Sequence, residues 1–249
     1  PGDVVRIEPH WHEAGLVPLQ PVGDRVNRIR DPLFEDLYKY ERIFIVSENG
    51  REERALAALP FEAVPTQRAL MSGINIIEVP VPSSPFLWEL RDNLAETKVS
   101  HVHGDSEKHC TKWDARRSRW DCDKPSKWTY VGAAEREVGD DPRECVWAHP
   151  LDRGRTLRLE AEVPASRLIR VRDSFDLRAA RLGGADVLVQ IFVNDKLEVE
   201  DRVKGNDDDW QAHDIDVSHI DGPAQLRIEI DLLGKIKNRF LCLNAWALR

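Results

Sequence analysis

The chain has 249 residues, of which 44 are acidic and 36 are basic, so it carries a net charge of −8. This acidic balance argues against a nucleic-acid-binding protein, whose surface normally presents a basic face. Hydrophobic residues make up 41% of the chain, enough to bury the core of one large domain or of two ordinary ones. No apolar run approaches the roughly 18 residues that a membrane-spanning helix needs.

The first hundred residues alternate between strand-like and helix-like segments. Short runs rich in valine and isoleucine are typical of buried strands, and they span residues 3–8, 42–47 and 74–79. Helical spacing or a capping serine followed by proline predicts helices over residues 31–40, 51–60 and 84–94. We therefore predict a small α/β domain with a largely parallel sheet over residues 1–100. No glycine-rich phosphate loop follows its strands, so nucleotide binding is not expected.

The rest of the chain follows a different pattern, in which apolar and polar side chains alternate. The alternation is clearest over residues 156–164, 185–195 and 225–233, and turn-forming residues separate these segments. A period of two over successive short segments is typical of antiparallel strands. We therefore predict an all-β sandwich over residues 101–249.

All four cysteines lie in the second half of the chain, at Cys110, Cys122, Cys145 and Cys242. Their number is even and none forms a CxxC pair, which favours two disulfides and an oxidising compartment over a zinc cluster. Four unpaired thiols in a cytosolic protein are the alternative. The first two cysteines bracket the basic, aromatic stretch HCTKWDARRSRWDC, and we expect them to close it as a loop at the junction of the two domains.

The late part of the chain resembles a galactose-binding-like jelly roll, a fold that recurs in carbohydrate-binding modules. The resemblance rests on a strand ending in VND at residues 193–195 and on a D..W....IDVS stretch at residues 207–218. It continues in the strand after the Gly222 turn and in the closing segment RFLCLNAWAL. The resemblance implies a jelly-roll β-sandwich that binds a glycan.

Two further expectations come with this resemblance. The first and last strands of a jelly roll are commonly neighbours, which implies a disulfide between Cys145 and Cys242. Modules of this kind often hold a structural calcium ion, and the acidic stretch at residues 205–210 offers oxygen ligands for one. No other cofactor is expected.

The first half of the chain is similar to the soluble C-terminal region of bacterial polytopic membrane glycosyltransferases. The similarity lies in PGDVVRIEPHW, DPLFEDLYKYERIFIVS and INIIEVPV. The chain starts in a strand-like segment rather than at a translation start, which fits a fragment of a longer protein. The resemblance implies a periplasmic or cell-surface location, tethering by membrane spans upstream, and a glycan or lipid-linked sugar as partner. It places the catalytic residue outside this chain.

Three tryptophans in a polar setting, Trp113, Trp120 and Trp128, are candidate sugar-binding residues. Exposed aromatic rings can stack on the apolar face of a pyranose. Three arginines lie in the same stretch, and they are Arg116, Arg117 and Arg119. Guanidinium groups can bind sugar hydroxyls or an anionic head group, so we predict that these six residues form the glycan-binding surface. Packing of the rings against the sandwich is the alternative.

Metal and catalytic sites are less well supported by the sequence. His101, His103, His109 and Cys110 cluster, but the cysteine has a disulfide partner available, and we predict no metal site there. No GxSxG or HExxH motif is present, so no catalytic residue is assigned. We expect the chain itself to be non-catalytic. The alternatives are a stand-alone carbohydrate-active enzyme and a purely structural protein-interaction module.

Overall fold

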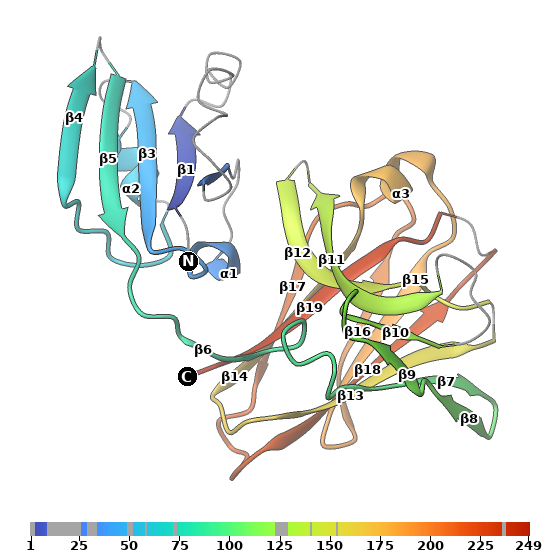
Figure 1. Ribbon diagram of the computed structural model, residues 1–249. Coiled ribbons are helices and arrows are strands. Elements are labelled where there is room, and N and C mark those ends of the chain that lie inside the picture. The colour runs from blue at the N-terminus through green and yellow to red at the C-terminus, as the bar shows by residue number, and fades with distance from the viewer. Residues whose placement is uncertain are drawn as a thin grey trace. The chain divides into compact units, whose positions relative to one another are not determined.

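The chain divides into two compact units, Pro1–Ser84 and Pro85–Arg249 (Figure 1). The structure is a computed structural model, and it describes residues 3–8, 26–28, 34–48, 52–57, 59–71, 74–122, 129–139, 141–152, 154–235 and 238–249. Within these ranges, no helix has both the length and the apolar character needed to cross a membrane.

The first unit is built on a five-stranded sheet of order β2-β1-β3-β5-β4. Its strands are β1 (Asp3–Glu8), β2 (Val26–Arg28), β3 (Arg42–Glu48), β4 (Gln67–Met71) and β5 (Ile74–Pro80). β1 is parallel to β2 and β3, but β5 is antiparallel to both β3 and β4. The largely parallel sheet expected from the sequence is therefore not supported, because the sheet is mixed. A two-residue connection joins β4 to β5, and such a short link allows only an antiparallel pair.

Two short helices lie within predicted helical segments of the first unit. They are α1 (Phe34–Leu37) and α2 (Glu52–Ala57). Their apolar side chains share a core with alternate residues of β3 and β5, and this core comprises Leu37, Ile43, Ile45, Ala55, Leu59, Ile77 and Val79. This core is separate from that of the second unit.

The helix predicted over residues 84–94 is wrong. Phe86–Glu89 form a strand, β6, and turns follow it. β6 pairs with the last strand of the chain, β19 (Leu241–Leu248), where Trp88 lies opposite Ala247. A strand that is distant in sequence thus supplies the backbone partners, and this pairing overrides the local helix signal. β6 belongs to the second unit for the same reason.

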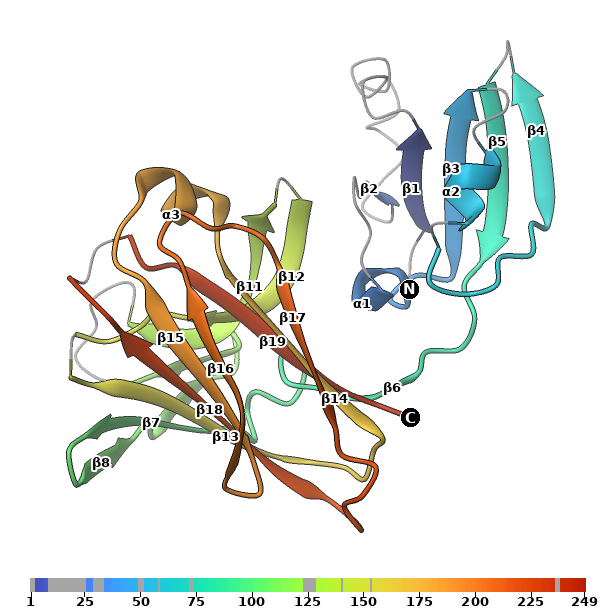
Figure 2. The same cartoon turned by 180° about the vertical axis from the view of Figure 1, so that it is seen from behind.

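The second unit is a sandwich of two antiparallel sheets (Figure 1, Figure 2). One sheet has eight strands, of order β17-β14-β19-β12-β11-β10-β9, with β6 paired to β19. The strands not yet located are β9 (Lys112–Asp114), β10 (Arg119–Asp121), β11 (Tyr130–Val138), β12 (Asp141–Ala148), β14 (Leu168–Phe175) and β17 (Gln211–Asp216). A short helix, α3 (Leu177–Leu182), follows β14.

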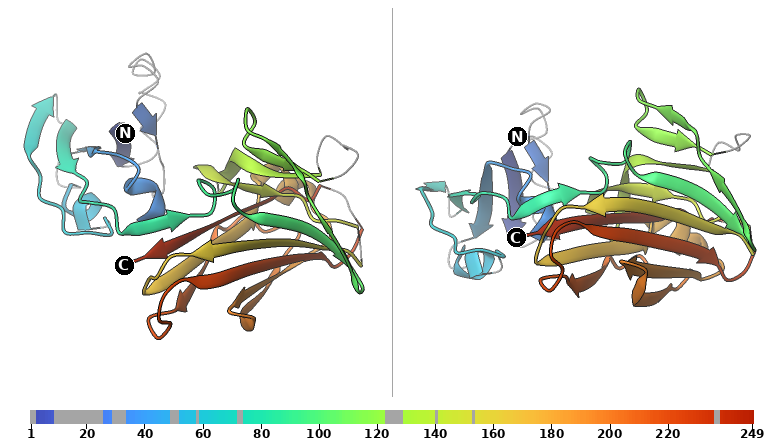
Figure 3. Two further views of the ribbon diagram at one scale, coloured as in Figure 1. Left: turned by 60° about the horizontal axis from the view of Figure 1, so that its bottom comes forward. Right: turned by 90° about the horizontal axis from the view of Figure 1, so that it is seen from below.

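The other sheet has six strands, of order β16-β15-β18-β13-β7-β8. Its strands are β7 (Lys98–His103), β8 (Ser106–His109), β13 (Thr156–Val163), β15 (Val187–Val193), β16 (Lys196–Val203) and β18 (Ala224–Leu232). The strand orders place β9 and β8 at one lateral edge of the sandwich and β17 and β16 at the other. Figure 3 shows the sheets from two further directions.

The core between the two sheets confirms the predicted alternation of side chains. The predicted apolar faces are buried along β13, β15 and β18, and they comprise Leu157, Leu159, Ala161 and Val163, then Val187, Val189, Ile191 and Val193, then Leu226, Ile228, Ile230 and Leu232. Burial of these aliphatic side chains is the main favourable contribution to folding of such a sandwich, at roughly 1.5–3 kcal/mol for each valine, leucine or isoleucine.

Candidate functional site

The stretch that the sequence singled out forms a β-hairpin of β9 and β10 at one lateral edge of the sandwich. Trp113 lies opposite Trp120, and Asp114 lies opposite Arg119. The Oδ1 atom of Asp114 accepts hydrogen bonds from the backbone N–H groups of Arg116 and Arg117, at 3.1 and 3.2 Å. An aspartate that bonds to the backbone two and three residues on is typical of a tight turn, and it fixes the hairpin tip.

Both predicted disulfides are present. Cys110 and Cys122 join the two ends of the hairpin, and their Cα atoms lie 4.4 Å apart. Cys145 of β12 and Cys242 of β19 are fully buried and contact Val138. Two disulfides are typical of a protein that folds in an oxidising compartment.

The two described tryptophans of the hairpin lie on the core-facing side of the sheet. Trp113 and Trp120 share a row with Val131, whose side chain is buried in the core. Their ring centroids lie 5.3 Å apart, and both rings are half-buried against the core. The Nε1 atom of Trp120 donates to the carbonyl oxygen of Leu94 at 2.8 Å, which anchors this ring. The third candidate, Trp128, lies outside the described residues.

The three candidate arginines do not form one cluster. Arg116 and Arg117 are exposed at the hairpin tip, and Arg117 lies 3.8 Å from Asp114. Arg119 lies on the opposite face of the hairpin from the tryptophans. Its Nε atom lies 3.0 Å from Asp121, and its guanidinium lies over the ring of Tyr130.

Sequence reasoning missed Tyr130 and Asp121 as neighbours of Arg119. Tyr130 lies opposite Asp121 on β11, and this register depends on strand pairing rather than on spacing along the chain. Gly132 is the signal for the close approach, because a Cβ atom there would lie 2.5 Å from the Cβ atom of Arg119.

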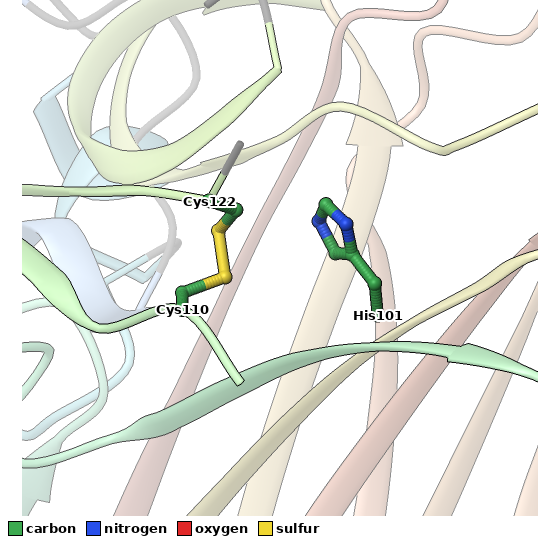
Figure 4. A group of neighbouring side chains, drawn as sticks. All are labelled: His101, Cys110 and Cys122. Carbon is green, nitrogen blue, oxygen red and sulfur yellow. A yellow bond between two sulfur atoms is a disulfide. The ribbon is translucent and has the colours of Figure 1, made fainter. Parts of the chain in front are cut away.

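Of the three clustered histidines named above, all of which are described, only His101 lies beside the hairpin disulfide. One of its ring nitrogens and both sulfur atoms lie within 4.8 Å of one another. Figure 4 shows the ring beside the disulfide. The sulfurs are bonded to each other and therefore cannot act as thiolate ligands. His103 and His109 are exposed. The arrangement gives no basis for a metal site at this edge.

Trp147 and Trp246 are buried on the face of the eight-stranded sheet that points away from the core between the sheets. The Trp147 ring stacks on Phe240 at 5.0 Å, and the guanidinium of Arg136 covers it at 4.2 Å. His149 is buried in the same aromatic group, and this burial lowers its pKa. The aromatic group packs the sheet and leaves these rings no exposed face for a ligand.

The acidic side chains of β17 that alternate in HDIDVS belong to the surface. Asp214 binds Arg170 through two hydrogen bonds, at 2.6 and 2.7 Å, and this bond lowers the pKa of the carboxyl group. Asp216 is exposed and accepts a hydrogen bond from the backbone of Ser218. Among the described residues, the contacts of both carboxylates are therefore those of a polar sheet surface.

No protein-family model matches the chain, and no curated protein matches it. Among solved structures, it is similar to the CBM51-2 and INT domains of Clostridium perfringens ZmpB in complex with GlcNAc, at 11% identity and a TM-score of 0.41. That alignment covers 75% of this chain and 40% of the other, so the chain spans less than half the length of this neighbour.

Two further solved structures are carbohydrate-binding modules. CBM51 of Clostridium perfringens GH95, in complex with methyl-galactose, aligns at 6% identity and a TM-score of 0.32, over 47% of this chain and 77% of that one. The xylan-binding module CBM15 aligns at 9% identity and a TM-score of 0.30, over 60% and 90%. No binding residue is carried over from these distant likenesses.

Proposed function

We propose that the second unit is a non-catalytic carbohydrate-binding module whose contact surface is the β9–β10 hairpin. The observation that carries the proposal is a pair of half-buried indoles, Trp113 and Trp120, at an open sheet edge beside two exposed arginines. Aromatic faces of this kind stack on sugar rings, and guanidinium groups donate to hydroxyl or anionic oxygens. Because Trp120 is anchored by its hydrogen bond to Leu94, Trp113 is the better candidate for stacking.

The charge of the hairpin tip favours an anionic ligand. Arg116 and Arg117 are exposed in a chain whose net charge is −8. Such a local basic surface attracts acidic glycans, or the phosphate groups of a lipid-linked sugar, over neutral sugars. Attraction at an exposed site is screened by salt, so the affinity should fall as ionic strength rises.

We also propose that the chain belongs to the extracytoplasmic region of a membrane-tethered glycosyltransferase. Two disulfides support an oxidising compartment, and the resemblance of the first half to the soluble region of such enzymes supports the context. The sequence upstream in the parent gene tests this proposal. A series of apolar spans is expected there, and a simple secretory signal would contradict membrane tethering.

The binding proposal is tested with a glycan array that contains neutral, acidic and phosphorylated sugars, followed by calorimetry on any ligand found. Changing Arg116 and Arg117 to Ala should weaken binding at least tenfold, and Trp113→Ala should have a similar effect. The matched control changes the two exposed arginines of α3, Arg178 and Arg181, to Ala, because it removes the same charge elsewhere.

The alternatives are outcomes of the same experiment. If no sugar binds, the second unit is an interaction module. If the α3 control weakens binding as much as the tip variants, net charge rather than the hairpin is responsible. Hydrolysis of a chromogenic glycoside by the purified chain would support the enzyme alternative instead.

A further inference from the structure

A second group of polar side chains lies at the opposite lateral edge of the sandwich. Asp173 of β14, Asp201 of β16 and His213 of β17 all point into the space between the sheets. Alternation establishes this direction, because each shares its face with a buried core residue two positions away, and these are Val171, Val203 and Ile215. β16 and β17 are the edge strands of the two sheets, so the group bridges one sheet to the other.

The three side chains converge on one point. The Nε2 atom of His213 lies 3.2 Å from Oδ2 of Asp173 and 3.7 Å from Oδ2 of Asp201. One ligand atom from each residue lies within 4.8 Å of the other two. A tetrahedral ion with bonds of about 2.0–2.1 Å to nitrogen and oxygen holds its ligands roughly 3.3–3.5 Å apart. The observed separations are close to this value.

The group is not satisfied by hydrogen bonds from the protein. The side chain of Asp173 is 0% exposed, and neither of its oxygens has a hydrogen-bond partner among the described residues. Oδ2 of Asp201 and Nε2 of His213 also lack a hydrogen bond of good geometry, so the ion pairs of His213 with the two carboxylates are the contacts that hold the group together. Two carboxylates side by side in a low-dielectric interior repel each other, and one imidazole compensates only part of their charge.

We propose that Asp173, Asp201 and His213 bind a divalent transition-metal ion of the zinc class. One imidazole nitrogen and two carboxylate oxygens suit such an ion better than calcium or magnesium, which prefer oxygen ligands alone. Three protein ligands leave a position for water, and the 15% and 28% exposed side chains of His213 and Asp201 provide solvent access. The ion clamps β16 of one sheet to β14 and β17 of the other.

The test uses the full 249-residue chain, freed of metal with a chelator and then dialysed against limiting Zn²⁺. About one zinc per chain should remain. The melting temperature should rise by roughly 5–10 °C when zinc exceeds its Kd a hundredfold. Co²⁺ in place of Zn²⁺ should give the visible absorption bands of a tetrahedral site, which requires no mutation.

Two variants address the ligands directly. Asp173→Asn and His213→Gln should each lower zinc affinity at least tenfold and abolish the rise in melting temperature. The matched controls are Asp209→Asn and His103→Gln, both at exposed positions, and they should bind zinc as the natural chain does. Far-UV circular dichroism checks that each variant is folded. If Asp173→Asn does not fold, the zinc affinity of His213→Gln and the cobalt spectrum of the natural chain test the proposal.

Three outcomes would overturn the proposal. The natural chain could retain no zinc, both triad variants could retain it as well as the controls do, or Co²⁺ could give no tetrahedral bands. A response to Ca²⁺ alone that Asp209→Asn abolishes would also count against the triad. It would instead support the calcium ion predicted at residues 205–210.

Discussion

Removing the Cys145–Cys242 disulfide should destabilise the second unit more than removing the Cys110–Cys122 disulfide. The two bonds close loops of very different length, with sequence separations of 97 and 12 residues. A crosslink restricts the unfolded chain by an amount that grows with the logarithm of the loop length. In this model, the long loop contributes about 4.7 kcal/mol and the short loop about 3 kcal/mol to the free energy of unfolding.

Packing increases the difference between the two bonds. Cys145 and Cys242 are 0% exposed and contact Val138 and the half-buried ring of Trp210. Replacing both with Ala leaves a cavity in this cluster, which costs on the order of 1 kcal/mol more. Cys110 and Cys122 are slightly more exposed, at 8% and 7%, and join the ends of a hairpin at the sandwich edge, so we expect a smaller cavity cost there. We therefore expect the two double variants to differ by roughly 2–3 kcal/mol.

The measurement is urea unfolding of the two double Cys→Ala variants under non-reducing conditions, monitored by tryptophan fluorescence. Thiol titration of the denatured proteins confirms that each variant retains its other disulfide. Equal destabilisation, or a larger loss for the Cys110–Cys122 variant, would refute the assignment of the main effect to loop length and buried packing.

Three other predictions concern stability of the second unit, each measured by urea unfolding. Burial lowers the pKa of His149 below 6.5, its value in the unfolded chain. The folded protein therefore holds the neutral imidazole, and its free energy of unfolding falls as the pH drops from 6.5 toward the folded-state pKa. His149→Gln should flatten the pH dependence below pH 6.5 by up to about 1.4 kcal/mol per pH unit; an unchanged slope would contradict this. Gly205→Ala should cost about 1–3 kcal/mol, because its Cβ would lie 2.2 Å from the carbonyl oxygen of Gly184. Asp176→Ala should cost about 1 kcal/mol, since its side chain accepts the Ala179 N–H at the start of α3, whereas Asp176→Asn should cost little.

The long strands of the sandwich were predictable because one face of each is buried. A strand such as Leu226 to Leu232 has a core on one side and polar surroundings on the other, so its period of two is visible without knowledge of its neighbours. The same holds for the Cys145–Cys242 pair, once the jelly-roll resemblance made the first and last strands neighbours.

The short strands at one edge were not predictable in this way. β8, β9 and β10 have three or four residues each, their side chains are mostly polar, and none of these side chains is fully buried. Pairing with neighbouring strands stabilises them, so the stretch expected to be a loop is a hairpin within the second unit. The position of Arg119 on the opposite face from Trp113 follows from this hairpin register, which spacing along the chain alone does not give.

The polar triad left a detectable signal that composition and motif spacing do not capture. Asp173 lies between Val171 and Phe175, Asp201 between Val199 and Val203, and His213 two residues before Ile215. Each is a polar residue at the core-facing position of an alternating strand, where an unpaired polar group is costly. A single polar residue of this kind can turn to solvent at a sheet edge, but here three of them meet, on the edge strands β16 and β17 and on β14 beside β17, which favours a common partner. The physical case for a bound cation therefore rests on the coincidence of these three breaks, and the zinc measurements test that coincidence directly.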